Sequence, residues 1–459
     1  MAEPRRGPVS GRDAATDAIL KQVRRFPDLH ALRPETGGLD PREAGLAAAI
    51  YDQAIRRWLT LRAIVEPKLR NGFERTAPEA CAALLAAGAQ MLLLDRVPTH
   101  AAVDGAVEWT KRRGGKNTAG LVNAVLRRVG EEKGERERLE QWSGGRDEIP
   151  LAGGGAIRVG GDGLPEEERA RVEAALSLPA RVIDRWQERF GRARARELSL
   201  RTIVQAPIVL NVAHATQALP EGLTEPHSTP GHAVWTGGAE ALSRLLGGRG
   251  DVWVQDPGSS ATVDSVRGMG FSRIIDQCAG RGTKTRQLRA VFPDAEIRAT
   301  DIDRDRFKDL RSVCAGMEGT RAMSMEALRE ASIGWADLVL IDAPCSNSAV
   351  LARRPEAKYR LRGASVEELA GIQRQLLADS IPLLSPRGSI LYATCSLEPE
   401  ENGAHRAWMQ RWHRMDAARE SERLGSGGPG EPAAGHADGG YSVLFVSCGS
   451  GSGARRGGR

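Results

Sequence analysis

The sequence predicts two domains of different classes, an all-α bundle at the front and a doubly wound α/β domain behind it. The chain has 459 residues, more than one domain usually holds. From residue 13 to about residue 132, apolar residues recur at three- and four-residue spacing, as on the buried faces of helices. After residue 250, short apolar runs alternate with helical segments, an order typical of a largely parallel sheet with helices on both faces.

Composition excludes several classes of protein. Hydrophobic residues make up 41% of the chain, but no apolar run has the length needed to span a membrane. The first fifteen residues lack the apolar segment of a secretory signal. The six cysteines are scattered without metal-ligand spacing, so we expect no metal site and a reducing, cytoplasmic environment. The net charge of +6 is compatible with a polyanionic partner, although many unrelated proteins carry such a charge.

The front domain contains one strongly basic stretch. Helices are expected over residues 40–65 and 78–94, and Asn117 is expected to cap a later one. The run from residue 111 to residue 128 has no acid and contains Lys111, Arg112, Arg113, Lys116, Arg127 and Arg128. Such a run is usually a solvated face, but beside a polyanion an uncompensated one binds phosphates.

The segments between and after the domains are less regular. Residues 133–178 are charged and glycine-rich, which predicts a flexible linker with at most one short strand. A small connecting subdomain is expected over 179–250, with an arginine-rich helix and a strand at 206–212. Residues 426–437 and 449–459 are glycine-rich and predict disorder, whereas 441–446 between them predicts a last sheet strand.

A strand, a glycine-containing turn and a helix follow one another at residues 273–285. This order brings the backbone close to a nucleoside cofactor, although a lone glycine pattern is a weak signal. The next strand, 295–300, delivers Asp301 at its end, where an acid can bind ribose hydroxyls. The alternative for Asp301 is the N-cap of a helix that begins near Asp303.

Two similar phrases, each with a cysteine followed by a serine, end two apolar runs. Asp342-Ala343-Pro344-Cys345-Ser346 follows the run 338–341, and Ala393-Thr394-Cys395-Ser396 follows 389–392. The carboxyl ends of strands in open α/β sheets are where ligands bind, so Cys345 and Cys395 suggest thiol chemistry there. The alternative, two ordinary small core residues, is weaker because the same setting occurs twice.

These residues resemble two known families. Residues 94–103 and 120–128 look like the RNA-binding domain of the antitermination factor NusB. Residues 276–285, 300–303, 342–346 with 353–355, and 394–402 resemble the successive motifs of the S-adenosylmethionine-dependent RNA cytosine-C5 methyltransferases. Together they make the chain similar to the ribosomal RNA small subunit methyltransferase B family. The resemblance implies a NusB-like helical RNA-binding domain (1–132) and a Rossmann-like doubly wound methyltransferase domain (251–448). With the composition, this predicts a flexible linker (133–178), a small connecting and RNA-binding subdomain (179–250) and a disordered basic tail (449–459).

The resemblance also assigns roles. Cys395 is the nucleophile that adds to C6 of cytosine, and Cys345 assists loss of the C5 proton and release of the product. Asp342 hydrogen-bonds the base near N3, as a general acid with a raised pKa if the pocket is dry. The implied partner is RNA, most simply small-subunit ribosomal RNA, bound through the basic run, and we expect a monomer. A transfer RNA cytosine would use the same site. The cofactor is S-adenosyl-L-methionine, and its implied ligands are Cys278, Ala279, Gly280, Arg281, Gly282, Thr283, Lys284, Asp301, Glu326 and Asp342.

Three positions depart from the family pattern. Arg281 enters a loop that usually reads Ala-Pro-Gly-Gly-Lys, although glycines remain on both sides of it. The segment 322–327 lacks the usual Gly-Asp adenine contact, for which Glu326 is a longer substitute. Asn211 stands where the family has an arginine beside RNA. Lys284 lies either near the cofactor carboxylate or on the helix surface.

Two other classes of function fit these residues less well. A non-catalytic RNA-binding or assembly protein on a relic fold has no need of Cys345, Cys395 and Asp342 together. A cysteine enzyme of acyl-transfer type needs a histidine partner, and His405 is the nearest in sequence to a strand-end motif.

Overall fold

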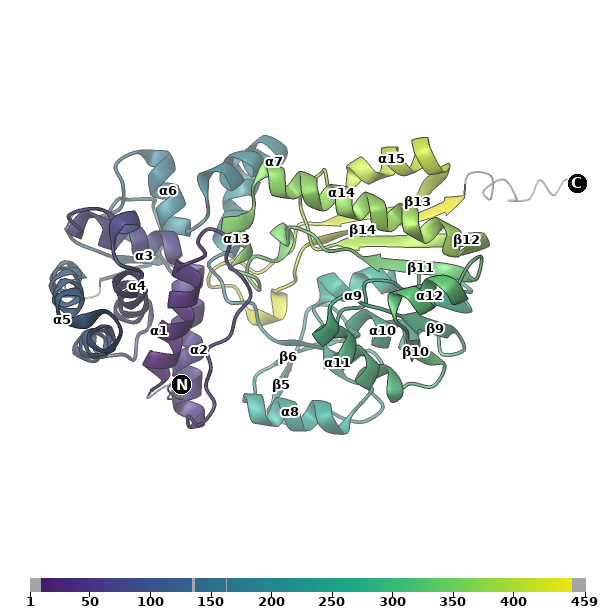
Figure 1. Ribbon diagram of the computed structural model, residues 1–459, viewed down its shortest axis with the longest axis horizontal. Coiled ribbons are helices and arrows are strands. Elements are labelled where there is room, and N and C mark those ends of the chain that lie inside the picture. Colours follow the sequence, from purple (N-terminus) through teal and green to yellow (C-terminus); the bar gives the residue numbers. More distant parts are fainter. Residues whose placement is uncertain (1–9, 134–136, 162, 448–459) are drawn as a thin grey trace, which may run out of the picture. The chain divides into compact units, whose positions relative to one another are not determined.

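The computed structural model describes residues 10–133, 137–161 and 163–447 (Figure 1). The chain divides into two compact units. The first comprises residues 1–205, 351–362 and 428–431, and the second comprises residues 206–350, 363–427 and 432–459. The predicted tail, 449–459, lies outside the described residues.

The first unit is mainly helical, as predicted. Its helices are α1 (Gly11–Val23), α2 (Pro41–Arg56), α3 (Trp58–Val65), α4 (Pro78–Leu93), α5 (Thr99–Lys133), α6 (Glu168–Leu176), α7 (Ala180–Arg201) and α13 (Ala357–Arg360). Asp40 caps α2 through its side chain, and Pro41 takes the first helical position, where no N–H is needed. Helix α4 is rich in alanine and leucine and is almost entirely buried, so it forms the centre of this core.

Residues 133–178 are more ordered than the sequence suggests. They contain a three-stranded antiparallel sheet, β1 (Arg138–Leu139), β2 (Glu148–Pro150) and β3 (Ala156–Arg158), followed by α6. Ile149 and Ile157 pack into the core of the helical bundle. The described part of this segment therefore belongs to the first unit rather than forming a flexible linker. The later helix that Asn117 was expected to cap begins two residues earlier, because α5 breaks at Gly115, whose φ is 82°.

A segment from far along the chain completes the core of the first unit. In residues 351–362, Tyr359 is fully buried and donates a hydrogen bond to the carbonyl of Ile55 at 2.6 Å. Its ring lies near those of Phe26 and Trp58, with centroids 5.6 and 6.5 Å away. Lys358 is also fully buried and donates to a main-chain carbonyl of α2. This short insertion is therefore part of the helical core.

The second unit is built on a seven-stranded sheet in the order β10-β9-β8-β11-β12-β14-β13. The pairs from β10 to β12 are parallel, and β14 runs antiparallel between β12 and β13. The doubly wound, Rossmann-like architecture is thus confirmed. The strands are β8 (Arg273–Asp276), β9 (Glu296–Ala299), β10 (Thr320–Ala322), β11 (Ala336–Asp342), β12 (Leu384–Thr394), β13 (Met415–Arg423) and β14 (Gly440–Ser447).

Helices cover both faces of this sheet (Figure 1). Val339 and Ile341 of β11 pack toward α12 (Met325–Ala331), α14 (Gly363–Ser380) and α15 (Gly403–His413). Leu338 and Leu340 of the same strand pack toward α9 (Pro257–Asp264) and α10 (Thr283–Val291). A strand buried on both faces reads as a continuous apolar run, which is why residues 338–341 were recognisable in the sequence.

A small antiparallel sheet precedes the large one in the second unit. Its order is β5-β6-β4-β7, from β4 (Val209–Asn211), β5 (Thr224–Pro226), β6 (His232–Trp235) and β7 (Trp253–Val254), and α8 (Ala239–Gly248) follows β6. Residues 426–437, expected to be disordered, instead form a closed loop. Ser426 and Ala437 pair as an antiparallel bridge across its ends.

Candidate functional site

The two cysteines meet at the carboxyl edge of the large sheet. Strands β11 and β12 are parallel neighbours in which Asp342 pairs with Ala393, so their following loops start side by side. The Sγ atoms of Cys345 and Cys395 lie 3.3 Å apart, and both side chains are partly exposed. A hydrogen bond to Cys395, together with burial, raises the pKa of Cys345 well above that of a free thiol. The predicted pairing of the two motifs is thus realised in space.

The carboxylate of Glu401 fastens the two cysteine loops together. It accepts hydrogen bonds from the main-chain N–H of Ser346 at 2.9 Å and from the hydroxyls of Ser346 and Ser396. Gln373 of α14 donates to the same carboxylate at 3.0 Å. Burial raises the pKa of Glu401, although these donors oppose the shift. The serine that follows each cysteine therefore donates a hydrogen bond to Glu401. The sequence analysis missed this role, although the repeated Cys-Ser pair was a signal for it.

Lys284 reaches the same edge from α10. Its Nζ donates to Asp342 Oδ2 at 2.7 Å and to Ser259 Oγ at 3.1 Å, and its side chain is 11% exposed. The surface alternative for this lysine is wrong. Burial lowers the pKa of Lys284, but the charge of Asp342 and the hydrogen bond to it raise the pKa overall. The ion pair of Lys284 and Asp342 therefore lies at the same edge of the sheet as the two thiols.

The loop between β8 and α10 keeps an open inner surface. Gly280 has φ 58°, and a Cβ placed there would meet no atom within 4 Å. Gly282 has φ 87°, and its Cβ would press against Val313 and Leu310 of α11 (Arg304–Ala315). Arg281 turns outward and pairs with Asp309. The unusual cation of this loop therefore leaves free the space next to Gly280.

Asp301 ties the end of β9 to this loop. Its Oδ2 accepts the main-chain N–H of Gly280 at 2.8 Å, and its Oδ1 accepts that of Asp303 at 2.9 Å. Asp303, not Asp301, caps α11. Next to Asp301, the side chain of Ile302 is 89% exposed, an apolar surface that the sequence analysis did not single out. Glu326 is exposed in the first turn of α12.

Asp276 ends β8 and is fully buried below the loop. Its Oδ2 accepts a hydrogen bond from Thr285 at 2.7 Å, while its Oδ1 has no hydrogen-bond partner. Burial raises the pKa of Asp276 to about 7. A fully buried carboxylate with one unpaired oxygen therefore lies at the base of the glycine loop, where it favours a positive charge nearby.

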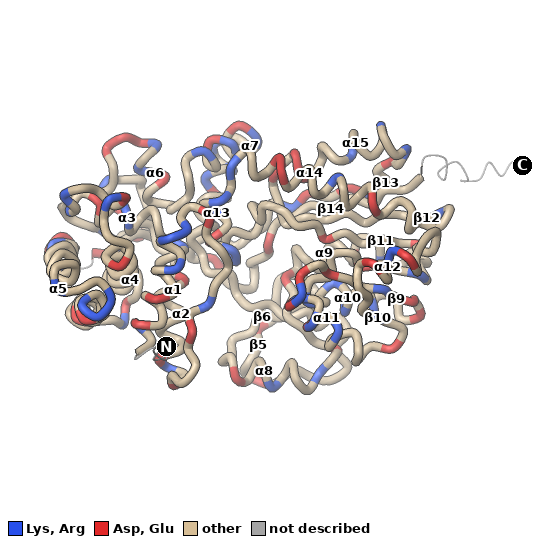
Figure 2. Tube along the Cα trace, in the orientation of Figure 1, with Lys and Arg blue, Asp and Glu red and all other residues tan. Residues whose placement is uncertain are grey.

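The basic run of the first unit is partly neutralised by α1. Arg112 pairs with Asp13 at 2.7 Å and Arg113 with Asp17 at 2.8 Å. Figure 2 shows blue basic residues on α5 and α7 interspersed with red acidic ones. The run is therefore not uncompensated, contrary to its appearance in sequence. The Nζ atom of Lys111 lies 3.5 Å from Oε1 of Glu108. The other exposed basic residues of the run are Lys116, Arg127 and Arg128.

Other candidate positions have structural roles. Asn211 is 2% exposed and donates to Gln255 at 2.9 Å, so it cannot take the place of an arginine beside RNA. His405 is fully buried and bonds Gln373 at 2.9 Å, and burial lowers its pKa to about 4. His405 therefore contacts Gln373, which in turn donates to Glu401, and it is not positioned as a base for either cysteine.

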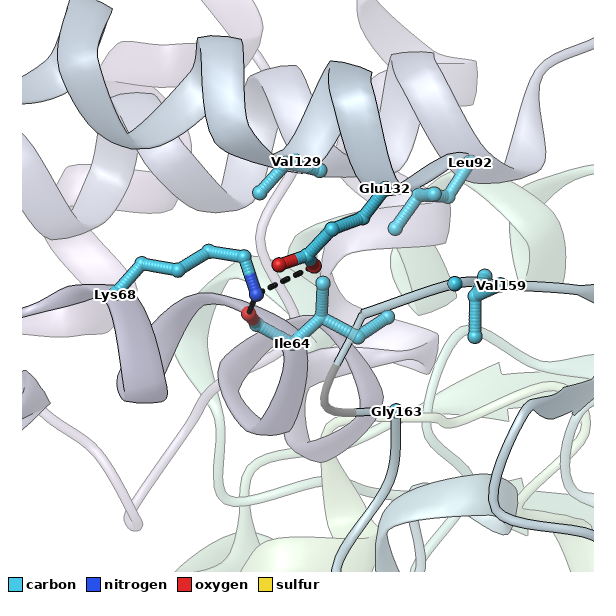
Figure 3. A pocket seen from close by; sticks show the side chains of 8 residues that line it. Ile64, Lys68, Leu92, Val129, Glu132, Val159 and Gly163 are labelled. Atoms are coloured by element: carbon cyan, nitrogen blue, oxygen red, sulfur yellow. Dashed lines mark hydrogen bonds and ion pairs between the residues drawn. The ribbon is translucent and has the colours of Figure 1, made fainter. Parts of the chain in front are cut away.

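Two other groups of described residues resemble ligand sites but have structural explanations. Asp256, His436 and Asp438 are buried with potential metal-binding atoms within 4.8 Å of one another. Asp256 Oδ1 already accepts two main-chain N–H groups, from Gly258 and Asp438, which accounts for its position. In the first unit, a cavity of about 10 Å³ adjoins the ion pair of Lys68 and Glu132 (Figure 3). That volume holds about one water molecule, so it is no substrate site.

Comparison with known proteins gives concordant matches. The family described as 16S rRNA methyltransferase RsmB/F matches residues 270–423, and the NusB family matches residues 11–131. A protein named ribosomal RNA small subunit methyltransferase B from Xanthomonas campestris pv. campestris is 30% identical over 82% of this chain and 81% of its own length. One of the same name from Vibrio cholerae serotype O1 is 30% identical over 70% of each chain.

A solved structure, PH0851, covers 95% of this chain and 98% of its own with a TM-score of 0.71 at 18% identity, which supports the fold alone. Among the described residues, each helix is too short or too polar to cross a membrane.

Proposed function

Because the chain belongs to the RsmB/F family of 16S rRNA methyltransferases, we propose that it methylates C5 of a cytosine in small-subunit ribosomal RNA through a covalent bond between Cys395 and C6. The observation that carries the proposal is the contact of the Cys345 and Cys395 thiols at 3.3 Å, at the ends of two adjacent parallel strands. Two thiols at a ligand-binding edge suit a reaction that needs a nucleophile and a second group for proton transfer.

The residues around the glycine loop fit S-adenosylmethionine, which supplies an electrophilic methyl group on a sulfonium. The free space at Gly280 lets the main chain approach the ligand. Asp301 keeps lone pairs for ribose hydroxyls, and the exposed Ile302 can cover the adenine ring. Glu326, exposed in the first turn of α12, is the proposed contact on the adenine side.

The protein groups act on the cytosine ring in a defined order. The Cys395 thiol loses its proton and its sulfur bonds to C6, while N3 gains a proton, so that C5 becomes electron-rich. Asp342, oriented by the hydrogen bond from Lys284, accepts a hydrogen bond from the protonated edge of the base. Cys345 is a thiol at rest because its pKa is raised, so it first gives its own proton to water; the thiolate that remains is a strong base and accepts the C5 proton after methylation. The bond between Cys395 and C6 then breaks, and N3 loses its proton.

The proposal is tested by bisulfite sequencing of RNA incubated with the purified protein and S-adenosylmethionine. We expect a single cytosine of small-subunit ribosomal RNA to become resistant to conversion, and transfer RNA to remain unmodified. Protection of a transfer RNA cytosine alone would refute the substrate but not the chemistry. Tight cofactor binding without any protected cytosine would favour a non-catalytic assembly protein.

A further inference from the structure

We propose that Asn347 is a positioning residue that keeps the Cys395 thiol protonated until the substrate arrives. The proposal rests on the proposed function only in treating Cys395 as the nucleophile. Asn347 follows Cys345 by two residues in the loop after β11. Its effect on the thiol can be measured in the free protein, without RNA.

The backbone of Asn347 is unusual. Its φ is 63°, in the left-handed region that few residues other than glycine adopt, although asparagine tolerates it best. From this position the side-chain amide reaches both cysteines. Its Nδ2 donates to the main-chain carbonyl of Cys345 at 2.8 Å, and its Oδ1 accepts from the Cys395 thiol at 3.3 Å.

The carbonyl of Cys345 fixes which way the amide points. A carbonyl oxygen only accepts hydrogen bonds, so the NH₂ group of Asn347 must face it. The amide oxygen is therefore left facing the sulfur of Cys395. An oxygen acceptor stabilises an S–H group and repels a thiolate, so this contact favours the neutral form of Cys395.

The thiol hydrogen bonds form a short chain that ends at the amide. The Cys395 thiol donates to Oδ1 of Asn347, so the contact of 3.3 Å between the two sulfurs is left for the Cys345 thiol to donate. Removal of the Cys395 proton would leave a thiolate facing the amide oxygen, whereas two protonated sulfurs satisfy both contacts.

Charged groups from other elements also face the two thiols. Lys284 of α10 favours a thiolate at Cys395, and Glu401, in the loop before α15, disfavours a negative charge on Cys345. Asp342 neutralises much of the effect of Lys284 by pairing with it at 2.7 Å. Asn347 thus acts where the nearby charges largely compensate one another. A neutral resting thiol reacts slowly with oxidants and alkylating agents, so the nucleophile is protected before the base enters.

The test is the pH dependence of Cys395 alkylation by iodoacetamide in the full-length protein without RNA, followed on the Cys395 peptide by mass spectrometry. Asn347→Gly removes the amide and keeps a residue that accepts the left-handed backbone. We expect the apparent pKa of Cys395 to fall by about one unit and the alkylation rate at neutral pH to rise about tenfold. The matched control is Arg414→Gly, a change at another left-handed residue, at the end of α15, for which we expect no shift.

A second variant should shift the apparent pKa of Cys395 in the opposite direction. Asn347→Asp replaces the amide by a carboxylate that disfavours the thiolate further, so the apparent pKa of Cys395 should rise. An unchanged or raised pKa in Asn347→Gly, or a lowered one in Asn347→Asp, would overturn the proposal. If the shifts occur but the protein methylates no RNA, the proposed function fails while the role of Asn347 stands.

Discussion

Replacing each cysteine by alanine should give two different defects. Cys395→Ala removes the group that bonds to C6, so neither methyl transfer nor any covalent complex with RNA should form. Cys345→Ala leaves the addition intact but removes the group proposed to accept the C5 proton. The RNA should then stay attached to Cys395, and a covalent complex should accumulate.

The structure allows the size of each effect to be estimated. Proton transfer by a positioned side chain contributes about 10²- to 10⁴-fold, so release of RNA from Cys345→Ala should slow by roughly that factor. Both thiols are partly exposed and touch each other at 3.3 Å, so truncating either leaves only a small, solvent-accessible gap. The stability cost should therefore be at most about 1 kcal/mol, too little to unfold the protein.

The assay is a denaturing gel of protein incubated with RNA and cofactor, read beside a urea unfolding curve for each variant. We expect a slow band for Cys345→Ala, none for Cys395→Ala, and similar unfolding midpoints for both. A band with Cys395→Ala instead would reverse the two roles. If neither variant trapped RNA and both still methylated it, the thiol mechanism would be wrong.

Three further outcomes follow from the geometry. Asp301→Ala should weaken S-adenosylmethionine binding, measured by calorimetry, by about 1–3 kcal/mol, because it also removes the hydrogen bond that holds the loop at Gly280. Glu326→Ala should weaken binding less, and equal effects of the two variants would contradict this prediction. Because burial lowers the pKa of His405 to about 4, the unfolded chain binds a proton that the folded one does not between about pH 6.5 and pH 4. The free energy of unfolding should therefore decrease by up to about 3 kcal/mol as the pH falls through that window. Urea unfolding of His405→Gln at several pH values should not show this decrease. Joint reversal of Lys116 and Arg127 to Glu should flatten the salt dependence of RNA binding; an unaltered slope would return the run to a solvated face.

The buried strands of the sheet could be predicted because each is a continuous apolar run. Residues 273–276 were expected as a strand and form β8, and 441–446 fall within β14. Strand β13 could not be predicted in this way. It lies at the sheet edge and reads as polar and charged, from Met415 to Arg423, because an edge strand is protected from unwanted pairing by charge.

The candidate site was predictable in its residue types more than in its contacts. Strand-end positions identified Cys345, Cys395 and Asp342, because neighbouring parallel strands bring their ends together. The pairing of Arg112 with Asp13 was invisible, since it joins residues 99 positions apart. The contact of Asn347 with both cysteines likewise depends on a left-handed backbone conformation that the sequence does not reveal.

The insertion of residues 351–362 into the helical core bears on how the chain acquires its structure during synthesis. The first unit cannot close around Phe26 and Trp58 until Tyr359 has been made. About 145 residues, 206–350, are translated in the meantime, which takes roughly 7–30 s at usual elongation rates. During that interval the nascent bundle exposes the apolar surface that Tyr359 later covers, and it is then most open to chaperones. A fragment that ends at residue 205 should therefore remain in this incomplete state, with a tendency to aggregate.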